Sequence, residues 1–260
     1  GSVVAIGAAG NDGMGLRGGH VRVFERQLDD SWTQVGADID GEAAFDGSGA
    51  SVSLSADGSV VAIGSTGNDG TGLRGGHVRV YVRQLNDIWT QVGADIDGEA
   101  AGDHYGRSVA LSSDGSVVAI GATGNDGTGA DLFAGHVRVF ERQLDDSWSK
   151  IGADIDGEAA YDESGRSVAL SSDGSVVAIG ATGNDGSGAL SSGHVRVFER
   201  QLDDSWTQVG ADIDGEAAND ESGVSVSLSA DGSVVAIGAA GNDGMGLRGG
   251  HVRVFERQLD

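Results

Sequence analysis

The chain has 260 residues, of which 38% are hydrophobic and 47 are glycine, and 40 acidic against 16 basic residues give a formal charge of −24. This charge repels nucleic acid and anionic membrane surfaces, so we expect no nucleic-acid partner. The absence of cysteine excludes disulfides and thiolate metal sites. The sequence also lacks a run of about 18 apolar residues, so we expect no membrane insertion.

The segment GSVVAIG occurs five times, beginning at residues 1, 58, 115, 174 and 232, at spacings of 57, 57, 59 and 58 residues. Residues 1–29 return letter for letter as residues 232–260. We therefore predict repeats over 1–57, which begins at a second strand, 58–114, 115–173 and 174–231, and a half repeat over 232–260. In such arrays each repeat buries its apolar surface mainly against its neighbours. Because both ends fall inside a repeat, we expect the array to continue past them.

The copy over residues 49–96 predicts four strands in order. Residues 51–55 alternate in polarity, Asp57-Gly58 is a strong hairpin turn, and residues 59–64 form a second strand that is apolar on both faces. A glycine-rich loop leads to a third strand over 77–83, and a fourth begins near Trp89. Four antiparallel strands in this length are typical of a β-propeller blade. The predicted fold is all-β, with about 4.5 tandem propeller-like blades in either a closed propeller or an open, filamentous array.

The run SGRSVALSSDGSVVAIGAT over 164–182, followed by GHVRVFER and a tryptophan strand, resembles the FG-GAP repeats of integrin-type β-propellers. The similarity is greatest to the short-hairpin variety of bacterial and algal surface proteins. The glycine of the signature is kept, but its phenylalanine is replaced by Ser48, Tyr105, Ser164 and Ser222. A short Ser-x-Asp-Gly turn stands where the family inserts its calcium loop, so that calcium site does not carry over.

An acidic loop, ADIDGEAAxD, follows the fourth strand and places four carboxylates at relative positions 0, 2, 4 and 8. Alternate carboxylates on a turning loop resemble the start of an EF-hand loop and suit Ca²⁺, which binds six to eight oxygens. The alternative is that these groups cap turns and solvate the loop. The candidate metal ligands are Asp38, Asp40, Glu42, Asp46, Asp95, Asp97, Glu99, Asp103, Asp154, Asp156, Glu158, Asp162, Asp212, Asp214, Glu216 and Asp220.

Histidine and tryptophan recur once per repeat. A histidine opens the third strand in every copy, with an arginine two residues on. We interpret these as a surface ladder that pairs with neighbouring Asp and Glu, with binding of acidic sugars as the alternative. The histidines are His20, His77, His136, His194 and His251. They are a whole repeat apart and cannot form one catalytic cluster. The tryptophans, Trp32, Trp89, Trp148 and Trp206, are predicted to pack between blades.

Near-identical copies argue against a single active site, because active sites are normally asymmetric. We therefore predict no catalytic residues and a non-enzymatic structural protein, extracellular or at the cell surface, belonging to a filament or stalk stabilised by calcium. Its expected partners are further copies or a continuation of the same chain in a fibre, with glycans or surface proteins as further candidates. The alternatives are a closed propeller for adhesion or glycan binding, and a propeller-fold enzyme.

Overall fold

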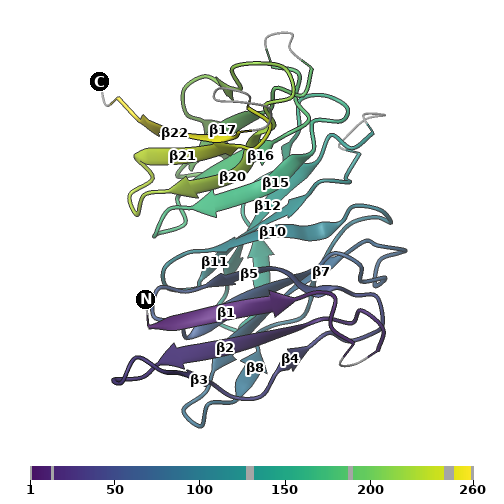
Figure 1. Ribbon diagram of the computed structural model, residues 1–260, viewed down its shortest axis with the longest axis vertical. Helices are drawn as coiled ribbons and strands as arrows, with labels where there is room; N and C mark the ends of the chain where they lie inside the picture. The colour runs from purple at the N-terminus through teal and green to yellow at the C-terminus, as the bar shows by residue number, and fades with distance from the viewer. Residues whose placement is uncertain (1, 13–14, 127–131, 187–189, 243–248, 259–260) are drawn as a thin grey trace. The chain divides into compact units, whose positions relative to one another are not determined.

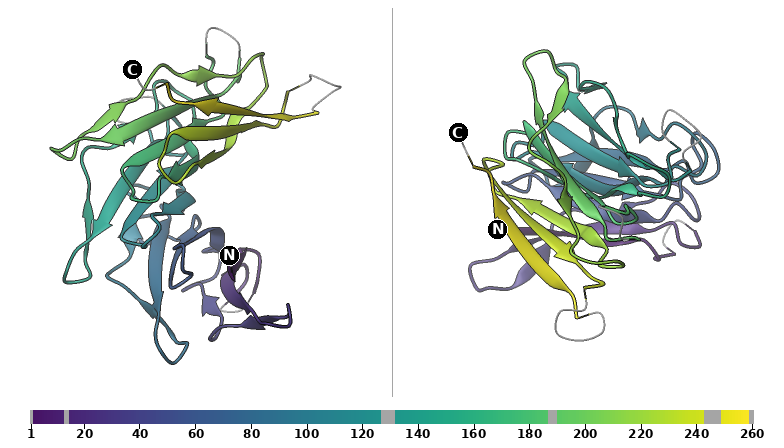
Figure 2. Two further views of the ribbon diagram at one scale, coloured as in Figure 1. Left: turned by 90° about the vertical axis from the view of Figure 1, so that its left-hand side faces the viewer. Right: turned by 90° about the horizontal axis from the view of Figure 1, so that it is seen from above.

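The computed structural model describes residues 2–12, 15–126, 132–186, 190–242 and 249–258, and over these it contains strands and turns but no helix (Figures 1 and 2). The all-β prediction is therefore confirmed. Within the same residues there is no helix with the length and apolar character needed to cross a membrane.

The strands repeat in the predicted order. The first strand of a repeat is β5 (Ser48–Leu54), β10 (Tyr105–Leu111), β15 (Ser164–Leu170) or β20 (Ser222–Leu228). The second is β1 (Val3–Ala8), β6 (Val60–Ser65), β11 (Val117–Ala122), β16 (Val176–Ala181) or β21 (Val234–Ala239). The third is β2 (His20–Arg26), β7 (His77–Arg83), β12 (His136–Arg142), β17 (His194–Arg200) or β22 (His251–Glu256).

The fourth strand is broken into two short pieces that both pair with the third strand. The first pieces are β3 (Trp32–Gln34), β8 (Trp89–Gln91), β13 (Trp148–Lys150) and β18 (Trp206–Gln208). The second pieces are β4 (Ile39–Asp40), β9 (Ile96–Asp97), β14 (Ile155–Asp156) and β19 (Ile213–Asp214). Over the described residues the first sheet, β1 to β4, has no first strand, and the last, β20 to β22, has no fourth strand.

The hairpin between the first two strands is held by the predicted Asp-Gly turn. Asp57 Oδ1 accepts hydrogen bonds from Ser55 Oγ at 2.7 Å, Ser59 N at 2.9 Å and Ser59 Oγ at 2.8 Å. Gly58 has a φ of 74°, a left-handed conformation that glycine adopts without strain. Backbone bonds from Ser55 N to the Val60 carbonyl at 2.9 Å and from Gly58 N to the Ser55 carbonyl at 3.0 Å complete the turn.

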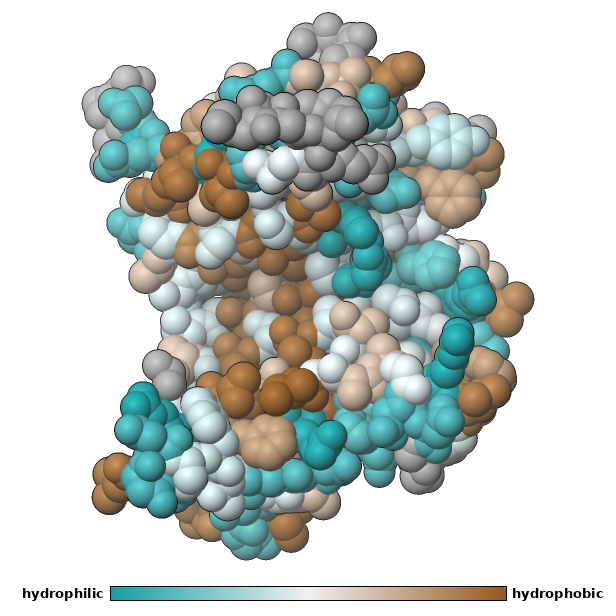
Figure 3. Space-filling model, viewed as in Figure 1, coloured by the Kyte–Doolittle hydropathy of each residue, from teal (hydrophilic) through white to brown (hydrophobic). Residues whose placement is uncertain are grey.

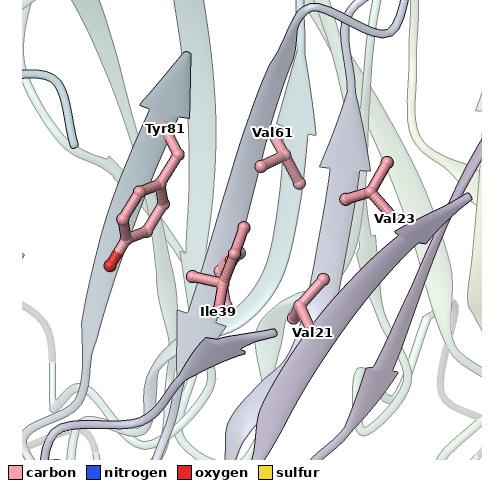
Figure 4. Packing of buried hydrophobic residues seen from close by; sticks show 6 residues of the cluster. Val21, Val23, Ile39, Val61 and Tyr81 are labelled. Carbon is pink, nitrogen blue, oxygen red and sulfur yellow. The ribbon is translucent and has the colours of Figure 1, made fainter. Parts of the chain in front are cut away.

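Hydrophobic side chains of neighbouring sheets form the core. Every residue of β6 is buried, which confirms a second strand covered on both faces. In one cluster, Val21 and Val23 of β2 pack with Val61 of β6 and Tyr81 of β7, and Ile39 of β4 lies among them (Figure 4). The chain divides into two compact units, residues 1–118 with 140–149 and residues 119–139 with 150–260. The third sheet contributes residues to both units.

The tryptophans hold successive repeats together, as predicted. The indole N–H of Trp89 donates to the Val35 carbonyl at 3.0 Å, that of Trp148 to Val92 at 3.0 Å, and that of Trp206 to Ile151 at 3.1 Å. A glycine follows each acceptor, and a Cβ added to Gly36 would lie only 3.0 Å from Trp89 Cδ1. The glycine therefore leaves room for the indole of the next repeat. We call this contact the tryptophan seam.

Candidate metal centre

The third strand begins with a histidine that the sheet places beside an acidic segment. His77 of β7 pairs with Asp97 of β9, which leaves Asp95, two residues earlier, next to the imidazole. Glu42 reaches the same point from the loop that follows β4 in the preceding repeat. The candidate site therefore combines residues from two consecutive repeats.

Three side chains converge in the first cluster, which consists of Glu42, His77 and Asp95. His77 Nδ1 lies 3.6 Å from Asp95 Oδ2 and 3.9 Å from Glu42 Oε2. These separations exceed a hydrogen bond. They match those of ligand atoms that share one ion, since ligands about 2.0–2.6 Å from a cation lie about 3–4 Å apart. The geometry fits a divalent cation between the three groups.

The second cluster repeats this arrangement with Glu158, His194 and Asp212. His194 Nδ1 lies 3.9 Å from Glu158 Oε2. The His194 side chain is 1% exposed, and within the described part of the chain its Nδ1 has no hydrogen-bond partner. A buried nitrogen without a partner is costly unless something binds it. This atom is therefore available to a ligand.

The surroundings keep both histidines neutral. Burial lowers the pKa of His77, and the positive charge of Arg79 lowers it further. Burial and then Arg196 lower the pKa of His194 in the same way. A neutral imidazole nitrogen is the form that binds a metal ion. At neutral pH these uncharged histidines can therefore bind a metal ion. They carry no positive charge that would neutralise the neighbouring carboxylates.

Acidic charge is crowded around the first cluster. Burial raises the pKa of Asp97, and the nearby negative charge of Asp95 raises it further. Arg79 compensates in part, because its Nη1 lies 3.6 Å from Glu42 Oε1 while its Nη2 donates to the Asp40 carbonyl at 2.8 Å. A bound cation would relieve the remaining repulsion.

The third repeat departs from this pattern. Gln91 Nε2 donates to Asp95 Oδ1 at 2.7 Å and Gln208 Nε2 does the same to Asp212, but Lys150 stands at the equivalent position. Lys150 Nζ donates to Asp154 Oδ1 at 2.6 Å, and Arg138 binds both oxygens of this carboxylate. Burial opposes ionisation of Asp154, but the bonds from Lys150 and Arg138 outweigh it and lower its pKa. Here protein cations hold the carboxylate.

The last aspartate of each acidic loop accepts hydrogen bonds from backbone amides of the same loop. Asp46 Oδ2 accepts hydrogen bonds from the amides of Glu42 at 3.1 Å and Ala43 at 2.9 Å, and the side chain is 3% exposed. The same pair of bonds occurs at Asp103, Asp162 and Asp220. These four residues cap the loop, as the alternative interpretation predicts.

Several of the other predicted ligands have contacts of their own. Asp38 Oδ1 accepts a bond from Gln34, and Asp38 Oδ2 lies 3.6 Å from His20 Nδ1. The backbone carbonyls of Asp156 and Asp214 accept bonds from Arg196 and Arg253. Glu216 Oε2 lies 3.7 Å from His251 Nδ1. The amide of Glu99 donates to Asp103. The structure thus brings together carboxylates of successive loops, Glu42 with Asp95 and Glu158 with Asp212.

The histidines are the part of the site that the sequence interpretation missed. We expected a surface ladder, but His77 and His194 are each 1% exposed and His20 is 5% exposed. The expectation of a surface position is wrong, because the start of the third strand is enclosed within its own sheet, where His77 lies opposite Ser65 of β6 and Asp97 of β9. His77 does lie near Asp95 and Glu42, at 3.6 and 3.9 Å, but the neutral imidazole forms neither a hydrogen bond nor an ion pair with them. An unchanged histidine at a strand start, next to an acidic loop, was the available signal.

No protein-family model matches the sequence, and neither does any curated protein. Among solved structures, the chain is similar to the periplasmic gluconolactonase PpgL of Pseudomonas aeruginosa, with a TM-score of 0.58 and 18% sequence identity. The similarity covers 91% of this chain, which spans 61% of the length of that protein. At this identity the likeness shows the fold alone, and the fold is a β-propeller.

This comparison corrects two expectations. The prediction of a non-enzymatic structural filament protein is contradicted, because the solved structure that the chain resembles is an enzyme. Near-identity of the repeats misled the interpretation, since it was taken to exclude an asymmetric site. The resemblance to FG-GAP repeats is supported only at the level of tandem propeller blades.

Proposed function

We propose that this chain is part of a propeller-fold hydrolase that opens ester bonds of the lactone type with the help of divalent cations. The observation that carries the proposal is the convergence of a buried, neutral histidine with two carboxylates in each of two repeats. The neighbouring fold supports the choice of reaction, because that protein is named a gluconolactonase. Acidic residues beside a neutral imidazole suit hydrolysis better than group transfer, which needs a second substrate site.

The chemistry needs one water molecule and one ring ester. Water adds to the carbonyl carbon, the ring C–O bond breaks, and the product is a hydroxy acid. A divalent cation held by the first cluster would polarise the carbonyl group. Glu42 is the most exposed of the three side chains, at 46%, and would face the substrate. The Arg79 guanidinium beside it would stabilise negative charge that develops on the carbonyl oxygen.

The identity of the ion is part of the proposal. The carboxylate-rich loops suit Ca²⁺, whereas an imidazole nitrogen is a ligand that Zn²⁺ and Mn²⁺ accept more readily. The two ions differ in coordination number. Ca²⁺ would need further oxygen ligands, whereas Zn²⁺ would need only four ligands in total. Binding of each ion alone, followed by calorimetry, separates them.

We also place the protein outside the cytoplasm. The similar solved protein is periplasmic. The absence of cysteine makes the fold insensitive to the redox state of the compartment. Fractionation of the source cells, with detection by an antibody against the chain, tests the placement.

The activity is tested by incubating the purified chain with gluconolactone and a panel of lactones while a pH indicator reports acid release. We expect hydrolysis above the uncatalysed rate, and loss of this activity with a chelator. The double variant His77→Asn and His194→Asn should lower kcat/KM by about tenfold or more. His104→Asn is the matched control, because His104 has a φ of 54°, which asparagine tolerates, and it belongs to neither cluster.

Two results would contradict the proposal. If hydrolysis stays at the uncatalysed rate with every ion and every lactone, the proposed enzymatic function is wrong. Cation binding is then tested separately by calorimetry. Full activity in the double variant would remove both clusters from the reaction.

A further inference from the structure

The third repeat carries a pair of exposed aromatic side chains that touch each other. Phe133, which precedes β12, is 45% exposed, and Tyr161, which follows β14, is 59% exposed. Their rings lie almost parallel, with centroids 6.1 Å apart and an interplanar angle of 28°. Figure 3 shows other hydrophobic side chains at the surface among hydrophilic ones, so exposure alone does not distinguish this pair. The backbone that carries the two rings does.

Both aromatic residues adopt left-handed backbone conformations. Phe133 has a φ of 56° and Tyr161 has a φ of 69°. Bulky residues rarely adopt this conformation, whereas glycine and asparagine adopt it with little strain. The residues equivalent to Tyr161 in the other repeats are Phe45, Gly102 and Asn219. The third repeat therefore keeps a strained, exposed ring at a position where a smaller residue is sufficient for the fold.

Hydrogen bonds hold this strained backbone in place. The amide of Phe133 donates to Asp126 Oδ1 at 3.1 Å. The amide of Tyr161 donates to the Leu132 carbonyl at 2.8 Å, and the amide of Glu163 donates to the Phe133 carbonyl at 3.0 Å. The two loops that carry the rings are thus joined to each other. Backbone strain that the surrounding structure fixes in this way is typical of binding and catalytic sites.

A polar pocket adjoins the aromatic pair within the second unit. Its volume is about 270 Å³, and Glu163, Arg166 and Thr182 are among the residues that line it. Gly183 also lines it, and a Cβ added to Gly183 would clash with the carbonyl oxygen of Tyr161. The pocket wall therefore packs against the backbone of Tyr161. A carboxylate and a guanidinium group thus lie close to two exposed ring faces.

This combination of groups fits a neutral pyranose sugar. A pyranose presents C–H groups on its ring face, and these are attracted to the negative face of an aromatic ring. Its hydroxyl groups both donate and accept hydrogen bonds, so Glu163 can accept and Arg166 can donate. The formal charge of −24 disfavours acidic sugars. A protein partner would cover about 800 Å² of this surface, which is far more than two rings and a small pocket provide.

We propose that Phe133 and Tyr161 bind a neutral pyranose sugar, whose ring stacks on the aromatic pair and whose hydroxyl groups bond to Glu163 and Arg166. The site occurs once, because the other repeats lack the second ring or both rings. The equivalent pairs are Arg17 with Phe45, Arg74 with Gly102, and Ser191 with Asn219. The site shares no residue with the His–Glu–Asp clusters, so it goes beyond the proposed hydrolysis and does not depend on it.

Affinity electrophoresis of the chain tests the proposal, because the charge of −24 carries it through a native gel that contains a neutral polysaccharide. The polysaccharides are hydroxyethyl cellulose, xyloglucan, galactomannan and starch, each in its own gel. We expect at least one of them to slow the chain relative to a gel without polysaccharide. Oligosaccharides released from that polysaccharide should restore the faster migration when they are added in excess.

Tyr161→Asn should abolish this retardation and raise the melting temperature, because asparagine relieves the left-handed strain. The matched control is Phe45→Asn. Phe45 has a φ of 70° and is 60% exposed, but Arg17 stands where the second ring would be. The control variant should also raise the melting temperature and should leave the retardation unchanged.

Three outcomes would overturn the proposal. The first is migration that none of the four polysaccharides slows; retention of the chain on a phenyl-substituted matrix would then assign the aromatic pair to an apolar partner. The second is equal retardation of the natural chain and the Tyr161→Asn variant. The third is loss of retardation in the Phe45→Asn variant, because binding would then not depend on the pair in the third repeat.

Discussion

The position of Gln91 differs between repeats: Gln208 is its equivalent in the fourth repeat, and Lys150 is its equivalent in the third. Gln91 and Gln208 leave the carboxylates of Asp95 and Asp212 to face a neutral histidine. Lys150 instead brings an ammonium group to Asp154. A Lys–carboxylate contact supplies the positive charge that a bound cation would otherwise supply. The natural chain thus contains a form of this site that could hold a cation and a form whose carboxylate is already paired with a lysine.

This difference predicts the effect of Gln91→Lys. The ammonium group should occupy Asp95 and lower the affinity of the first cluster for a divalent cation by about tenfold or more. Isothermal titration should then report one ion, at the second cluster, whereas we predict two ions at these clusters in the natural chain. Gln91→Glu, which keeps the side-chain length without the positive charge, is the control. Unchanged stoichiometry in the lysine variant would show that the ion binds elsewhere.

The tryptophan seam gives a second prediction at the residue scale. Trp89→Phe removes the indole N–H that bonds to Val35 and keeps most of the ring packing. The free energy of unfolding should fall by about 1 kcal/mol. Trp32→Phe should change it little, because Trp32 is 49% exposed. Denaturant unfolding of both variants measures the difference, and equal losses would refute the seam.

Among the elements, the hairpin turn between the first and second strands is the most regular. In the last copy Asp231 accepts hydrogen bonds from Ser229 Oγ, Ser233 N and Ser233 Oγ. These bonds favour the ionised form and lower the pKa of Asp231 from 3.8 to about 2, with the Ser229 hydroxyl the largest cause. Four serine–aspartate turns of this kind stabilise the four hairpins.

The lowered pKa fixes the pH range over which this turn stabilises the fold. The folded pKa lies below the unfolded one, so the contribution is present above about pH 4 and disappears as the pH falls towards about 2. Asp231→Asn should lower the melting temperature at pH 7, and the gap from the natural chain should close by pH 2. A gap of equal size at both pH values would mean that the charge does not matter.

The elements were largely predictable from the sequence because their signals are local. Asp57-Gly58 specifies a hairpin, and the run Val60 to Ile63 specifies a strand buried on both faces. The break in the fourth strand was not predicted. It occurs where Gly93 adopts a φ of 73° and the indole of Trp148 approaches, a contact from the next repeat. Local patterns do not report such contacts.

At the scale of the whole molecule, the same limit explains why the metal site was only partly predicted. The spacing of Asp38, Glu42 and Asp46 suggested one ion within one loop, but backbone amides occupy Asp46. Glu42 instead lies close to His77 and Asp95 of the next repeat. The carboxylates were found, while their grouping and the histidine depended on how successive sheets stack.

The account as a whole depends on whether the His–Glu–Asp clusters hold an ion. The most direct measurement is a crystal structure of the chain grown with Mn²⁺ and recorded at a wavelength where manganese scatters anomalously. We predict anomalous density about 2.0–2.6 Å from His77 Nδ1 and at the equivalent place beside His194. Well-ordered clusters without anomalous density, with only water beside His77 and His194, would contradict the account.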